Sequence, residues 1–132
     1  MHITDRMIYG LVSEEERIAF INATAKYLTQ SVADNQTDLF GPGDYEEPFI
    51  TIMNDRLVNY AECGFKDDQP GYDFTRYLAR NIADIMSATD EKWVVEQVMD
   101  IEAPTIVEKI TSVVTDVLGL RQRKAVKASK EQ

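Results

Sequence analysis

The stretch Pro70–Met86, PGYDFTRYLARNIADIM, decides the fold class of this chain. Its apolar residues recur every three or four positions, so that on an α-helix they draw one continuous apolar stripe. These residues are Phe74, Tyr77, Leu78, Ile82, Ile85 and Met86. Oppositely charged residues with helical spacing occupy the other face, for example Arg80 and Asp84. Because such a helix is stable only when other elements cover its stripe, the stretch predicts a helical domain.

Three further segments show the same periodicity. They are residues 14–34, 46–62 and 104–118. The first follows Ser13 and Glu16, whose spacing is that of a capping box. The last begins at Pro104, which is favoured in a first helical turn, and ends at Gly119. Ordinary helix signals therefore delimit these segments.

The predicted fold is all-α. We expect a compact helical bundle of four main helices with short helices near 4–11 and 90–101. The main helices are predicted at about 14–34, 46–62, 71–86 and 104–118. Asn, Asp, Gly and Pro residues in 35–45 predict a loop. Residues 1–120 should form a single helical domain, and the basic residues 121–132 a disordered tail.

The charge of the chain is unevenly distributed. Residues 1–120 hold 22 Asp and Glu against 9 Lys and Arg, a balance of −13, whereas residues 121–132 have a balance of +4. The acidic body disfavours nucleic acid as a partner. No apolar run is long enough to span a membrane, and the N-terminus has no secretory signal pattern. A lone Cys63 fits a reducing compartment, so the expected location is the cytoplasm.

Common catalytic and metal-binding patterns are missing from the sequence. His2 is the sole histidine, and there is no CxxC pair or glycine-rich phosphate loop. Residues 36–47 match a calcium-binding loop poorly, because Gln36 and Phe40 stand where oxygen ligands are required. We therefore predict no catalytic, cofactor-binding or metal-binding residues, and expect the protein not to be an enzyme.

Three groups of residues remain as candidate sites. Aromatic residues and a thiol near the connection between the second and third main helices form a candidate ligand pocket, with Tyr60, Cys63, Tyr72 and Tyr77. The wide apolar stripe of the last main helix forms a candidate self-association face, with Ile106, Ile110, Val113 and Val117. The basic tail offers candidate contacts to an anionic partner, with Arg121, Arg123, Lys124 and Lys127.

The leading hypothesis is a cytoplasmic, non-enzymatic helical interaction module that self-associates as a homodimer and contacts an unidentified protein partner. It is based on the absence of recognisable catalytic patterns and on the apolar surface predicted at 106–118. Further exposed apolar residues are expected at Tyr9, Ile52 and Trp93. The alternatives are a small-molecule binder or enzyme that uses the cluster in 60–77, and a regulator that contacts an anionic partner through its tail.

Overall fold

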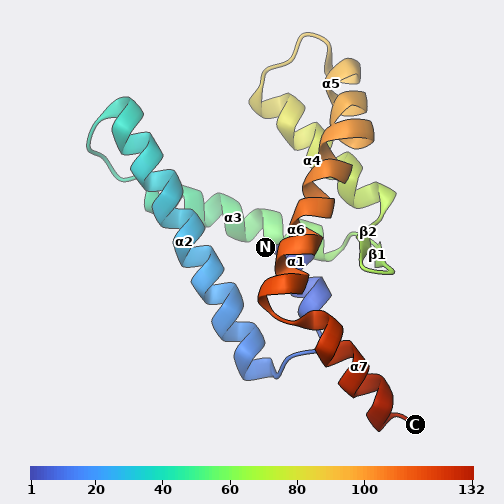
Figure 1. Ribbon diagram of the computed structural model, residues 1–132. Coiled ribbons are helices and arrows are strands. Elements are labelled where there is room, and N and C mark those ends of the chain that lie inside the picture. Colours follow the sequence, from blue (N-terminus) through green and yellow to red (C-terminus); the bar gives the residue numbers. More distant parts are fainter.

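The computed structural model describes residues 1–132 and confirms the all-α prediction (Figure 1). The helices are α1 (His2–Ile8), α2 (Glu14–Phe40), α3 (Glu46–Ala61), α4 (Tyr72–Ile85), α5 (Glu91–Gln97), α6 (Ala103–Val117) and α7 (Leu120–Lys130). A two-stranded hairpin, β1 (Phe65–Lys66) and β2 (Gln69–Pro70), joins α3 to α4. No helix has the combination of length and apolar character that crossing a membrane requires.

The β-hairpin was not predicted from the sequence, because each strand has two residues and shows no alternation. Its turn consists of Asp67 and Asp68, both with positive φ (54° and 60°), as a type I′ turn requires. The Asp73 carboxylate then accepts hydrogen bonds from the backbone N–H groups of Gly64 and Phe74. These bonds tie the entrance of the hairpin to the first turn of α4.

Helices α5 and α6 are continuous, whereas the sequence predicted two separate helices at 90–101 and 104–118. They are joined by a π-helical turn, Val98–Glu102. Pro104 has no N–H to donate and would clash with the carbonyl of an ordinary preceding turn. The wider π turn just before Pro104 accommodates the proline without ending the helix.

Helix α2 ends later than predicted. It runs to Phe40, so residues 35–40 are helical and only 41–45 form a loop. Asn, Asp and Thr lower helix propensity by only a few tenths of a kcal/mol each, so they do not end a long helix by themselves. Gly41, with φ 85°, provides the actual end. The predicted start at the capping box of Ser13 and Glu16 is confirmed.

In the segment 121–132, for which the sequence predicted disorder, the structure has helix α7 over Leu120–Lys130. Leu120 is 2% exposed and anchors α7 in the core. The Arg123 guanidinium donates to the carbonyl of Leu118 and pairs with Glu16, 3.4 Å away. Lys124 pairs with Asp68 of the hairpin turn. Basic composition suggested a solvated tail, but one apolar residue and two ion pairs fix it.

The core lies in two clusters that share α4. The first joins α1, α4, α6 and α7 and consists of Ile3, Met7, Ile8, Phe74, Val107, Val114 and Leu120. The second joins α4 to α5 and α6 through small side chains and consists of Ala79, Ala83, Val94, Val98 and Ala103. Helix α1 lies at the centre of the molecule, and Ile8 is fully buried. Short α1 therefore holds the longer helices together.

Helices α2 and α3 pack mainly against each other and form an arm, which we define as residues 14–61. In Figure 1 the arm leans away from α6, so that the two diverge above α1. Thr29 is its sole buried residue. The whole chain exposes 9225 Å², whereas a globular monomer of 15.0 kDa typically exposes about 7,000 Å². The chain thus exposes about 2,200 Å² more than such a monomer, and the sparsely buried arm contributes to that excess.

Candidate functional site

The predicted ligand cluster is in part a packed aromatic group. The Tyr60 ring centroid lies 4.5 Å from that of Phe74 and 4.9 Å from that of Tyr77, in an edge-to-face arrangement with Tyr77. His2 stacks on Phe74 at 5.8 Å. Such contacts stabilise a helix junction by about 0.5–1.5 kcal/mol per pair beyond the buried area. The cluster therefore joins α1, α3 and α4.

The Tyr77 hydroxyl oxygen accepts hydrogen bonds from Arg56 (3.0 Å) and Asn59 (2.8 Å) of α3. Burial alone would raise the pKa of Tyr77, but these bonds stabilise its phenolate and lower it. At Tyr60, burial dominates and raises the pKa. The Tyr77 hydroxyl thus forms a polar contact between α3 and α4.

Tyr72, the third tyrosine of the predicted pocket, does not join the cluster. It is 70% exposed and borders a separate groove between α4 and α5, with Arg76, Arg80 and Glu96. Tyr72 and Tyr77 are five residues apart, which places their side chains about 140° apart around a helix. The structure therefore brings Tyr60 and Tyr77 together and directs Tyr72 elsewhere.

Cys63 follows α3 and its Sγ donates to the carbonyl of Asn59, 3.6 Å away. Burial raises the pKa of the Cys63 thiol, and the carboxylates of Asp73 and Glu62 raise it further. Because the thiolate is the reactive form, this environment suppresses nucleophilic chemistry at neutral pH.

Cys63 is accordingly expected to react several-fold more slowly with iodoacetamide at pH 8 in the native protein than in urea. Its rate should keep rising above pH 9, since the folded thiol ionises at higher pH than the unfolded one. Intact-mass measurements over time report this single site directly, because the chain has one cysteine. A native rate equal to the unfolded rate would contradict the described environment.

A groove of about 620 Å³ lies between α1, α2 and α3 and was not predicted from the sequence. Its apolar wall includes Ile18, Ile21 and Leu57. Its main cation, Arg17, donates to Asp5 at 2.6 Å and pairs with Glu14 at 3.0 Å, so two carboxylates raise its pKa. Since Arg17, Asp5 and Glu14 pair with one another, the groove mainly offers apolar surface to a ligand.

The predicted self-association face is largely exposed on α6. Val117 is 71% exposed, Val113 60% and Ile106 49%, whereas Ile110 packs partly against the first core cluster. These residues flank the buried stripe of Val107 and Val114. The width of the stripe thus exceeds what the core of one chain covers.

The arm carries a second set of uncovered apolar side chains. They are Ile18, Tyr27, Leu28, Leu39, Phe40, Ile50, Ile52 and Val58. Tyr9 and Trp93, which the sequence suggested as exposed, are 69% and 57% exposed. Sequence reasoning counted the α2 stripe as core, because periodicity identifies an apolar face without showing what covers it.

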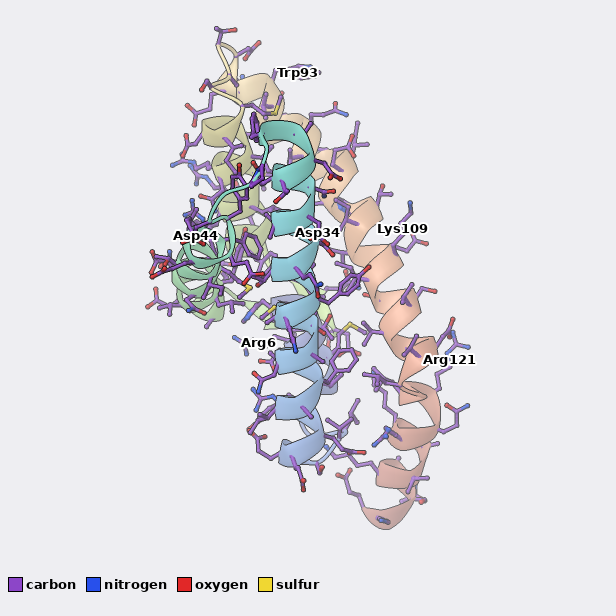
Figure 2. The ribbon with its side chains drawn as sticks, turned by 90° about the vertical axis from the view of Figure 1, so that its left-hand side faces the viewer. Arg6, Asp34, Asp44, Trp93, Lys109 and Arg121 are labelled. Atoms are coloured by element: carbon purple, nitrogen blue, oxygen red, sulfur yellow. The ribbon has the colours of Figure 1, made fainter.

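The predicted anionic-partner residues lie on α7. Arg121 is exposed and points outward in Figure 2, and Lys127 is exposed as well. Neither forms an ion pair, whereas Arg123 and Lys124 are paired within the chain.

Residues 36–47, which matched a calcium-binding loop poorly, do not form a twelve-residue loop, because residues 36–40 belong to helix α2. No group of three or more His, Cys, Asp or Glu side chains is arranged to hold a metal ion.

Comparison of the chain with family models, curated proteins and solved structures gives no match.

Proposed function

We propose that this protein is a non-enzymatic helical interaction module that acts as a homodimer. The observation that carries the proposal is the excess surface of about 2,200 Å², together with the exposed apolar side chains on the arm and on α6. Exposed apolar side chains lower the solubility of a monomer, and a partner that covers them contributes the free energy of their burial.

The area suits a second copy of the chain. Two chains that each bury about 2,200 Å² would form an interface of about 4,400 Å² in total, within the range of obligate homodimers. A twofold interface uses the same surface twice, so the α6 face and the arm of each chain can cover one another. The proposal thus accounts for both uncovered surfaces with one partner.

The test is the joint replacement of Val113 and Val117 with lysine. Both side chains are exposed, so the chain should fold, but the buried charges should convert the dimer to a monomer at micromolar concentration. Sedimentation velocity measures the mass. The matched control replaces Thr105 and Ser112 with lysine, which adds the same charge at exposed polar positions of α6. A wild-type protein that stays monomeric at high concentration would overturn the proposal.

A further inference from the structure

The two ends of the molecule carry opposite charge. From Tyr27 to Asp55 the arm holds six acidic residues and no lysine or arginine. The acidic residues are Asp34, Asp38, Asp44, Glu46, Glu47 and Asp55. Helix α7 holds five basic residues and no acidic one. The turn between α2 and α3 and helix α7 lie at opposite ends in Figure 1, and Figure 2 likewise separates Asp44 from Arg121. Within one chain the six acidic residues named above form no ion pair with α7.

The charges also have the sign that their own helices disfavour. Asp38 lies in the last turn of α2, which has no basic residue, although the negative end of the helix dipole favours cations. Arg121 lies in the first turn of α7, where there is no acidic residue and the positive end favours anions. Each misplaced charge costs about 0.3–1 kcal/mol in an isolated helix. An oppositely charged partner surface would offset that cost.

We propose that the two copies of the homodimer pair about a twofold axis so that the acidic end of each arm contacts α7 of the other copy. This inference rests on the proposed function and specifies its geometry. Helices α2 and α6 run in opposite directions within one chain, so a twofold axis perpendicular to both sets α2 of one copy parallel to α6 of the other. The acidic end of α2 then lies beside the basic helix, with apolar faces between them.

The pairing uses groups that have no partner within the chain. Asp34, Asp38, Arg121 and Lys127 are exposed and form no ion pair. Apolar contacts alone specify the relative orientation of the two copies poorly. Opposite charges favour the arrangement in which the arm meets α7, and like charges disfavour the arrangement in which two arms or two α7 helices meet. The anionic partner of α7 is thereby the arm of a second copy.

Two charge-reversed variants test the pairing. The arm variant combines Asp34→Lys with Asp38→Lys, and the tail variant combines Arg121→Glu with Lys127→Glu. The arm variant suits the α2 dipole better than the wild type does, so its helix is retained. Each variant alone should dimerise roughly tenfold or more weakly than the wild type at low salt, because like charges meet twice in each dimer.

Mixing the variants supplies the decisive measurement. In the mixed dimer the lysine arm meets the glutamate tail, and the wild-type tail of the first chain meets the wild-type arm of the second. Near wild-type affinity should therefore return on mixing, as measured by sedimentation with one fluorescent variant. If each variant alone dimerised with the affinity of the wild type, this pairing would be overturned, whereas the proposed self-association would stand. Loss of affinity without recovery on mixing would also overturn it, because charges that act within one chain are not rescued by another.

A wild-type protein that shows no self-association would overturn the proposed function and this pairing together. Unaltered circular dichroism of both variants separates weaker pairing from unfolding. The effect should also shrink as sodium chloride rises from 50 to 500 mM, because salt screens exposed charges over about one Debye length.

Discussion

Replacing Ile8 with aspartate is expected to prevent the chain from folding. Ile8 is fully buried where α1 meets α4, α6 and α7 in the first core cluster. Truncating a buried isoleucine costs about 2–5 kcal/mol, and desolvating a carboxylate there adds several more. The total is comparable to the whole stability of an ordinary domain, about 5–15 kcal/mol. Far-UV circular dichroism and urea titration measure the loss.

The matched control for this variant is Ile85→Asp at the end of α4. Ile85 is 80% exposed, so the same chemical change should shift stability by less than about 1 kcal/mol. Ile8→Ala gives an intermediate case in which folding is retained with a lower urea midpoint. If Ile8→Asp unfolded at a midpoint close to that of the control, α1 would not hold the core together as described.

The second large effect is expected in hydrogen exchange of the arm. Helix α2 has 27 residues with one of them buried, and helices of that kind are held mainly by packing against other elements. Without a partner, residues 30–40 should open with little free-energy cost. Dimerisation at a hundredfold excess over Kd stabilises them by about 2.7 kcal/mol, which corresponds to about a hundredfold slower exchange.

Exchange measured by mass spectrometry at protein concentrations below and above Kd would show this dependence. Residues 74–83 of α4 are the internal control, because the two core clusters cover them in the single chain. The variant with lysine at Val113 and Val117 should exchange rapidly in the arm at every concentration. Equal protection of the arm at all concentrations in both proteins would contradict a role for dimerisation in stabilising it.

The candidate site was predictable only in part. Tyr60 and Tyr77 face each other across the connection between α3 and α4, as their position near that connection suggested. Tyr72 could have been excluded from its angular position alone. The groove between α1, α2 and α3 could not be predicted, because it depends on how far the arm diverges from the core. No pattern in a sequence encodes that angle.

The sequence by itself determined the four main helices, with errors at the end of α2 and at the start of α6. Apolar periodicity, the capping box at Ser13 and the glycines at Gly41 and Gly119 are local signals, since backbone conformation within a helix depends on neighbours a few residues away. Only the tertiary structure decided which apolar stripes became core. The α4 stripe is covered from Phe74 to Ile82, whereas its end at Ile85 and Met86 and much of the surface of α2 and α6 are not. It also ordered α7, because burial of Leu120 depends on residues remote in sequence, and burial is a property of the assembled chain.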